Sequence, residues 1–392
     1  MKAYYISGCI PYNGKSGGRL ASYNHIKKIC NEYDEVEAFF VDMHGDIDEL
    51  EDLNFPNNLK YTVYPKECSK FNPRSFTSIF ILMYQILFSL MPRSLFIGRS
   101  NKLILDIYNI YKKDNENLFI FENIDSCGNL KFNFKYIYIC HNVESKLSFD
   151  AIKYAKKIKI PFYYLNAIKM YFFERKVLKN SIKNVFISDK DMSNLSNFGP
   201  SKLYPEFIGL KNNLWNLSVT NKSVLFLGSA HHFPNQEAAS WLLYKLSELL
   251  FKLDPDITIN ICGMKFSDIK NNSSEINHFN NVKFLGKVSD EELQNQFLVN
   301  RLFISPIILG SGIKMKVLEA ASYGMPIIAT PESIEGLSYL KENVIILERE
   351  DLIKFSEKLV VTINSLELLK SMSINLVEKV KKNSTNYEKY FT

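Results

Sequence analysis

The stretch RLFISPIILGSGIKMKVLEAASYGMPIIAT, residues 301–330, decides the fold of this 392-residue chain. An apolar run ends in the loop LGSG, a helix-like segment follows, and Gly324 and Pro326 precede a second apolar run. This order predicts a strand, a glycine-rich loop, a helix and a second strand. Such a succession is typical of a parallel α/β sheet with helical connections.

The start of that helix is a predicted anion site. Backbone N–H groups in the first turn lack intrahelical partners, and the helix dipole adds about half a positive charge there. Lys314 and Lys316 bring two ammonium groups, so the expected anion is a diphosphate. Glu319, about one turn farther on, is suited to accept two hydroxyl protons, as from a ribose. The residues alone are equally compatible with an ordinary glycine turn, followed by a surface ion pair between Lys316 and Glu319.

The same stretch resembles the donor-binding segment of the group 1 glycosyltransferases of GT-B fold, in their family 4 type and bacterial polysaccharide branch. In that family a glycine-rich loop leads into the motif (R/K)-x-K-(V/I)-L-E-A, followed by G-x-P-(V/I)-(V/I)-A-T. Residues 314–320 match the first motif and residues 324–330 match the second. The resemblance is strongest from Val224 to Leu337 and weaker before it. It implies two Rossmann-like doubly wound α/β domains that face each other across a cleft.

The resemblance also implies a set of functional residues. The catalytic group would be His141, Lys314 and Glu319. Donor binding would involve Gly17, Gly18, Arg19, Asn142, Gly228, Asn235, Gly263, Lys287, Val288, Gly310, Ser311, Gly312, Ile313 and Lys316. Many relatives carry an arginine and a lysine where this chain has Ser229 and Asn235, and a glutamate where it has Ser311. Lys314 and Lys316 are expected to supply the missing positive charge.

Apolar runs divide the chain into two α/β halves. In the first half strands are expected at 3–8, 36–41, 118–122, 136–140 and 184–188, and a helix at 19–31. In the second half strands are expected at 223–228, 257–263, 282–286, 302–307, 326–330 and 344–347. The irregular stretch Asn197–Lys222 predicts the linker, which gives an acceptor-binding domain at 1–205 and a donor-binding domain at 206–374. The resemblance implies that a last helix, about 375–392, packs back on the first domain.

The cysteines and the apolar stretches indicate a cytosolic protein, and no metal or cofactor is expected. The six cysteines have no C-x-x-C spacing, which argues against a disulfide framework or a metal site. The apolar stretch Ser75–Ile97 is interrupted by Gln85, Pro92 and Arg93 before it reaches the ~20 residues that span a bilayer. It predicts a buried or interfacial helix.

The segment Ala151–Lys183 combines nine lysines and arginines with many aromatic residues and a single acid, Glu174, which we expect to serve helix packing. Aromatic and basic residues at helical spacing are typical of a helix on an anionic membrane surface. A core helix with a solvated basic face explains the pattern equally well. No nucleic-acid motif accompanies the charge, so a nucleic-acid partner is not expected.

Together these features predict a retaining, metal-independent hexosyltransferase for surface polysaccharide biosynthesis. The donor would be a UDP or GDP type sugar, and the acceptor a saccharide or lipid-linked saccharide. The enzyme would work in the cytoplasm, with peripheral contact to the inner membrane face. Two alternatives stay open: a GT-B nucleotide-sugar epimerase, which needs acid and base carboxylates, and a non-catalytic protein that binds sugar nucleotides.

Overall fold

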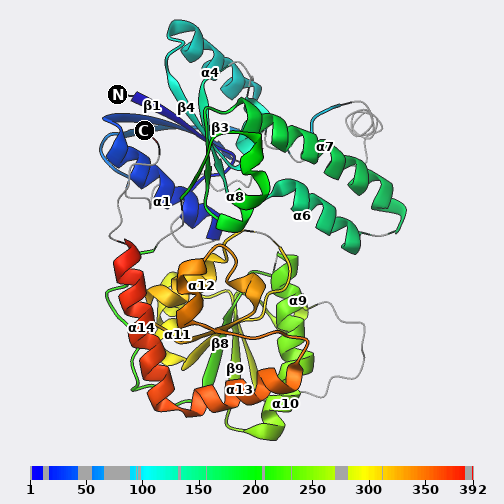
Figure 1. The fold of residues 1–392 in the computed structure, drawn as a ribbon, viewed down its shortest axis with the longest axis vertical. Helices are drawn as coiled ribbons and strands as arrows, with labels where there is room; N and C mark the ends of the chain where they lie inside the picture. The colour runs from blue at the N-terminus through cyan, green and yellow to red at the C-terminus, as the bar shows by residue number, and fades with distance from the viewer. Residues whose placement is uncertain are drawn as a thin grey trace. The chain divides into compact units, whose positions relative to one another are not determined.

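The computed structural model in Figure 1 divides into two compact units, Met1–Glu206 with Glu388–Thr392, and Phe207–Tyr387. The structure describes residues 2–11, 17–42, 55–65, 89–93, 95, 99–130, 134–155, 157–204, 208–230, 232–269, 281–310, 312–384 and 391. Each unit contains one parallel sheet with helical connections, which confirms the predicted α/β class.

The first unit is built on a parallel sheet in the order β3-β2-β1-β4-β5-β6-β7. Its strands are β1 (Lys2–Ser7), β2 (Glu35–Asp42), β3 (Leu59–Pro65), β4 (Leu118–Glu122), β5 (Tyr136–Cys140), β6 (Lys183–Phe186) and β7 (Ser201–Leu203). Alternate residues of β1 enter two different cores, Tyr4 and Ile6 on one face, Ala3 and Tyr5 on the other. Both faces are therefore covered, which explains why the central strands are continuous apolar runs.

The helices of the first unit are α1 (Gly17–Glu32), α4 (Asn101–Lys113), α5 (Asn123–Ser126), α6 (Glu144–Asp150), α7 (Ile160–Asn180) and α8 (Asp189–Leu195). Helices α6 and α7 pack against each other (Figure 1). Glu174 on α7 is fully buried and accepts bonds from the Glu144 N–H, at 2.7 Å, and the Ser145 hydroxyl, at 2.5 Å. The acid that we expected in helix packing thus caps the N-terminus of α6.

The outer face of α7 is aromatic as well as basic. Its inner face buries six residues, among them Met170, Phe173 and Val177. On the outer face Phe172 is 67% exposed, and just before the helix Ile158 is 82% exposed. Other exposed side chains there are Phe162, Tyr163, Tyr164, Tyr171, Lys157, Lys159, Lys176 and Lys179. A solvated basic face alone does not account for this composition.

The second unit has a parallel sheet in the order β10-β9-β8-β11-β12-β13. Its strands are β8 (Ser223–Leu227), β9 (Thr258–Cys262), β10 (Val282–Gly286), β11 (Leu302–Ser305), β12 (Ile327–Ala329) and β13 (Ile345–Ile346). Its helices are α9 (Phe233–Trp241), α10 (Ser247–Leu253), α11 (Asp290–Val299), α12 (Met315–Ser322), α13 (Leu352–Asn364) and α14 (Leu366–Ser384), with a π-helical turn at Leu242–Leu246. The predicted strand, loop, helix and strand at 301–330 are present as β11, α12 and β12.

Two strands were missed in the sequence. β3 is an edge strand in which only Tyr64 is buried, so no apolar run marks it. β7 lies inside the stretch predicted as linker. It has only three residues, directly after Gly199 and Pro200, and pairs with β6.

The chain returns to the first unit near its end. Helix α14 ends at Ser384 and belongs to the second unit, while residues 388–392 belong to the first. Phe391 is fully buried there beside Tyr204, and its N–H donates to Glu32 Oε2 at 2.8 Å. A C-terminal segment around Phe391, rather than the described part of the last helix, makes this contact.

Among the described residues, no helix combines the length and apolarity that a membrane crossing requires. Most of the apolar stretch Ser75–Ile97 lies outside those residues, so the helix expected there has no counterpart to compare.

Candidate functional site

Three neighbouring strands of the second unit end in glycine at the same edge of the sheet. Gly228 follows β8, Gly263 follows β9 and Gly286 ends β10. The Gly228 N–H donates to Cys262 O at 2.9 Å, and the Gly263 N–H donates to Gly286 O at 2.8 Å. A Cβ atom on Gly263 would lie 2.6 Å from Gly228 O. The backbones therefore approach more closely here than side chains permit, at the edge where open α/β sheets bind ligands.

The loop between β11 and α12 depends on glycine as well. Gly310 and Gly312 have φ of +95° and +73°, a region that L side chains rarely adopt. Ser311, between them, lies outside the described residues, and Ile313 is half-buried. The loop delivers the chain to Lys314, the residue before α12.

The two lysines at the start of α12 have different hydrogen-bond partners. Lys314 Nζ donates to Gly312 O at 2.8 Å. Lys316 Nζ donates to Asn235 Oδ1 at 2.6 Å, and Asn235 Nδ2 donates to Ser229 O at 3.2 Å. Asn235 thus fixes the position of the Lys316 ammonium.

Burial, and the Lys314 ammonium as a second cause, lower the pKa of Lys316 to about 7. Lys316 is therefore about half neutral at pH 7 and must take up a proton to face an anion.

We expect UDP affinity to fall as the pH rises from 7 to 9. Above pH 7 the charged form of Lys316 becomes tenfold scarcer per pH unit, so the dissociation constant should rise by up to about tenfold per unit. The measurement is calorimetric titration of UDP at pH 7, 8 and 9. Lys316→Arg, which stays charged throughout, is the matched control and should give a nearly flat profile. UDP affinity of the wild type that does not change with pH would contradict the assignment of Lys316 as a phosphate-binding group.

Glu319 lies one turn into α12 and is half-buried. Burial raises the pKa of its carboxyl, while the nearby Lys211 ammonium acts in the opposite direction. Within the described part of the chain, this carboxylate makes no hydrogen bond and no ion pair within 4.0 Å. Both oxygens are thus available to accept hydrogen bonds from hydroxyl groups, as expected for a ribose contact.

The other predicted residues of the second unit lie at the same edge of the sheet. Lys287 is exposed and Val288 is half-buried, and both follow β10 directly.

In the first unit, helix α1 begins at Gly17, as the glycine turn predicted. Gly18 is exposed, and a Cβ atom there would meet nothing within 4 Å; Arg19 is half-exposed. Asn142 follows β5 and donates to Glu144 Oε1 at 3.2 Å. Residues 12–16, which precede α1, lie outside the described residues.

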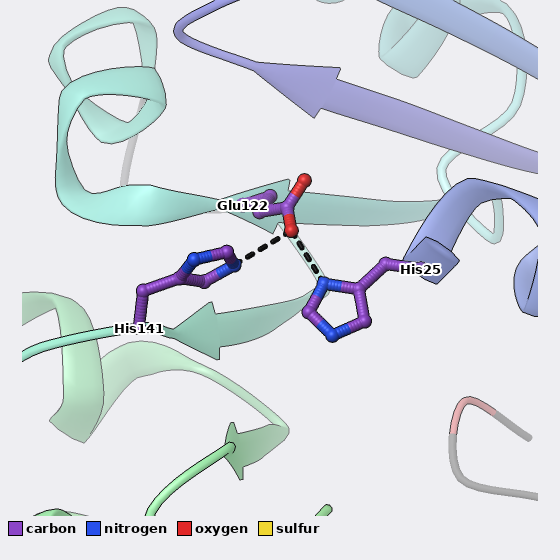
Figure 2. Close-up of side chains that lie close together, drawn as sticks. All are labelled: His25, Glu122 and His141. Atoms are coloured by element: carbon purple, nitrogen blue, oxygen red, sulfur yellow. Dashed lines mark hydrogen bonds and ion pairs between the residues drawn. The ribbon is translucent and has the colours of Figure 1, made fainter. Parts of the chain in front are cut away.

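His141 belongs to a buried cluster that the sequence did not indicate. Figure 2 shows His25 from α1, Glu122 at the end of β4 and His141 after β5 pointing toward one another. His25 Nδ1 lies 2.5 Å and His141 Nε2 lies 2.7 Å from the same oxygen, Glu122 Oε1. Among the described residues this is the one group of three with a composition that suits a metal ion.

One signal for Glu122 was present in the sequence, because an acid closes the apolar run LFIFE at a strand's carboxyl end. His25 has no such signal, since it is 97 residues away from Glu122 and lies within an ordinary helix.

Comparison with known proteins finds a family that the second unit resembles. Residues 221–365 match the family model for glycosyl transferases group 1, and this range contains the glycine edge and α12. This part of the second unit is thus similar to the group 1 glycosyltransferases. A curated relative, an uncharacterized 44.6 kDa protein in the cps region of Klebsiella pneumoniae, is 25% identical over 231 residues. That match covers 56% of this chain and 58% of the relative, less than two thirds of its length.

Solved structures show that the chain has the GT-B fold. A Staphylococcus aureus TarM variant, in complex with Fondaparinux, alpha-GlcNAc-glycerol and UDP, superposes with a TM-score of 0.68 at 12% identity, over 97% of each chain. Anabaena HepE, in complex with UDP and glucose, gives 0.62 at 13% identity, over 97% of this chain and 95% of HepE. The lipopolysaccharide outer core galactosyltransferase WaaB gives 0.58 at 14% identity, over 98% of each chain.

Proposed function

We propose that this protein is a retaining glycosyltransferase that moves a sugar from a nucleotide-diphosphate sugar to a hydroxyl of a saccharide or lipid-linked saccharide. The observation that carries the proposal is the arrangement at the start of α12, within the segment that matches the family. There Lys316 donates a hydrogen bond to Asn235, and the Glu319 carboxylate can accept hydrogen bonds from a ligand. An anion site and a diol site one turn apart suit a nucleoside diphosphate.

The chemistry then rests on stabilising the leaving group. When the bond between sugar and β-phosphate breaks, negative charge grows on the phosphate. This negative charge is stabilised by Lys314, Lys316 and the N–H groups at the start of α12. Preorganised donors of this kind contribute ~3 kcal/mol each in other enzymes. The departing phosphate oxygen accepts the proton of the attacking hydroxyl, so this scheme uses no metal. His141 in the first unit supplies a hydrogen bond to a sugar hydroxyl.

The biological context follows from the relatives. The Klebsiella relative comes from a cps region, and WaaB acts on lipopolysaccharide outer core. The HepE and TarM complexes both contain UDP. These names support a UDP type donor and a role in the assembly of surface polysaccharide.

A transfer assay tests the function. The protein is incubated with UDP and GDP sugars and a panel of saccharide acceptors, and nucleotide release and product are followed by NMR. The proposal predicts release that depends on acceptor, and a product with the donor's anomeric configuration. An inverted product would contradict the retaining mechanism, and release that never depends on any acceptor would contradict the transfer.

Nucleotide-sugar epimerase is the second candidate, because two carboxyls of the first unit are suited to proton transfer. Burial raises the pKa of Asp125 to about 6 and that of Glu144 to about 8. Such values favour acid and base catalysis near neutral pH. The same NMR assay without acceptor separates the two functions, since an epimerase converts the sugar while it stays bound to the nucleotide.

We also propose that the outer face of α7 contacts an anionic membrane. Burying Phe172 and Ile158 in the lipid interface would contribute up to ~1.5–3 kcal/mol each, and each lysine near the surface about 1 kcal/mol. The double variant Phe172→Ser, Ile158→Ser should therefore bind vesicles with about 30% phosphatidylglycerol at least tenfold more weakly than the wild type.

Co-sedimentation measures this binding. Leu105→Ser on α4, which removes a side chain that is 59% exposed on another helix of the same unit, is the matched control and should bind like the wild type. Equal binding of the double variant would exclude this face as the contact. Equal binding of the wild type to neutral vesicles would contradict the preference for an anionic membrane.

A further inference from the structure

The cluster of His25, Glu122 and His141 runs from the interior of the first unit toward its surface. His25 and Glu122 are fully buried, whereas His141 is 6% exposed. Glu122 ends β4, which lies beside β5 in the sheet, and His141 directly follows β5. Of the three side chains, His141 alone reaches the surface, so a ligand can touch the cluster only there.

The backbone fixes Glu122 in this place. Asn123, the next residue, has φ of +62° and is the one non-glycine residue with positive φ among those described. This conformation is uncommon outside glycine, and asparagine tolerates it better than most residues. It lets the chain turn from β4 directly into α5. The position of Glu122 is therefore set by this turn as well as by the strand.

The two contacts to one oxygen determine where the ring protons lie. An ionised carboxylate only accepts hydrogen bonds, so each facing nitrogen must carry a proton. His25 is then protonated on Nδ1 and His141 on Nε2 (Figure 2). In a neutral imidazole the other nitrogen keeps its lone pair. His141 thereby presents Nδ1 as an acceptor.

A metal ion explains this geometry less well. Zinc binds histidine nitrogen and carboxylate oxygen at about 2.0–2.2 Å, which places neighbouring ligand atoms roughly 3.3 Å apart in a tetrahedral site. The separations of 2.5 and 2.7 Å are those of hydrogen bonds.

We propose that Glu122, supported by His25, is a positioning residue that holds His141 in the Nε2–H tautomer, so that Nδ1 accepts a hydrogen bond from a sugar hydroxyl. The inference deepens the proposed function and rests on it for the identity of the ligand. Glu122 does not touch the substrate; it sets the tautomer and the ring orientation of the residue that does.

Nitrogen NMR of the histidine rings tests the tautomer without any substrate. The protein is labelled with 15N-histidine, and the His141 signals are identified by their loss in His141→Gln. In the wild type we expect a protonated Nε2 and an unprotonated Nδ1. Glu122→Met, which has a similar shape and no acceptor, should move both nitrogens toward the averaged shifts of exchanging tautomers. Glu122→Gln keeps an acceptor oxygen and should retain most of the wild-type pattern.

Three results would overturn the inference. They are a wild-type His141 protonated on Nδ1, identical His141 shifts in the wild type and Glu122→Met, and a stoichiometric zinc ion that is lost in Glu122→Met. The wild-type spectrum decides the tautomer even if Glu122→Met fails to fold.

Kinetics separate this inference from the proposed function. In Glu122→Met, kcat for transfer should fall roughly 10²-fold, as for loss of an oriented hydrogen-bonding group, with UDP affinity within threefold of the wild type. Transfer at the wild-type rate by a variant with altered His141 shifts would overturn the positioning role. If the wild type shows the expected tautomer but neither binds UDP nor transfers sugar, the proposed function fails and the tautomer assignment stands.

Discussion

Gly263→Ala is expected to destabilise the second unit by roughly 2–5 kcal/mol. Gly263 has φ of +94°, and a Cβ atom there would lie 2.6 Å from Gly228 O and 3.0 Å from Gly228 C. Both atoms belong to the backbone of the neighbouring strand end, so they cannot rotate away as a flexible side chain would. The alanine thus adds a strained conformation to a clash that only a shift between β8 and β9 relieves.

Chemical denaturation of wild type and variant measures this loss. Gly209→Ala is the matched control in the same unit, because its Cβ atom would meet nothing within 4 Å. It should leave the free energy of unfolding unchanged or raise it by less than ~1 kcal/mol. A loss under 1 kcal/mol for Gly263→Ala would show that the glycine edge is not as tightly packed as described.

Glu319→Ala is expected to weaken binding of the donor nucleotide by ~1.5–3 kcal/mol, or roughly 10- to 150-fold. The reason is the loss of a charged acceptor for two ribose hydroxyls. The same substitution should not lower the free energy of unfolding. Because burial raises the pKa of this carboxyl, ionised Glu319 is less favourable in the folded than in the unfolded chain at neutral pH. The alanine variant should therefore be at least as stable as the wild type.

Two variants make this prediction specific. Glu319→Gln keeps one acceptor oxygen and should lose less affinity than the alanine variant. Glu357→Ala, which removes an exposed acid from α13 in the same unit, should bind like the wild type. Loss of affinity with loss of stability in Glu319→Ala would indicate a structural role and contradict the ribose contact.

The sequence was most predictive where function is encoded locally. The loop and helix of residues 301–330 could be predicted because Gly310, Gly324 and Pro326 mark the turns between two apolar strands. Lys314, Lys316 and Glu319 lie within two helical turns, so their common location followed from spacing alone.

Contacts between distant residues could not be predicted in this way. The hydrogen bond between Asn235 and Lys316 joins residues 81 positions apart, and neither local sequence pattern predicts it. Glu122 and His141 lie on neighbouring strands, but His25 reaches them from a helix that shows no polar signature. The edge strand β3 was missed for a related reason, since its outer residues are polar and its register depends on β2.

The most direct test of the account is calorimetric titration of the purified protein with UDP, GDP, ADP and CMP, with and without magnesium, followed by the best ligand on Glu319→Ala. We predict micromolar binding of one nucleoside diphosphate, equal in the presence and absence of magnesium and weakened at least tenfold in the variant. Absence of binding by all four nucleotides, or equal affinity in Glu319→Ala, would contradict the assignment of a donor site to the start of α12.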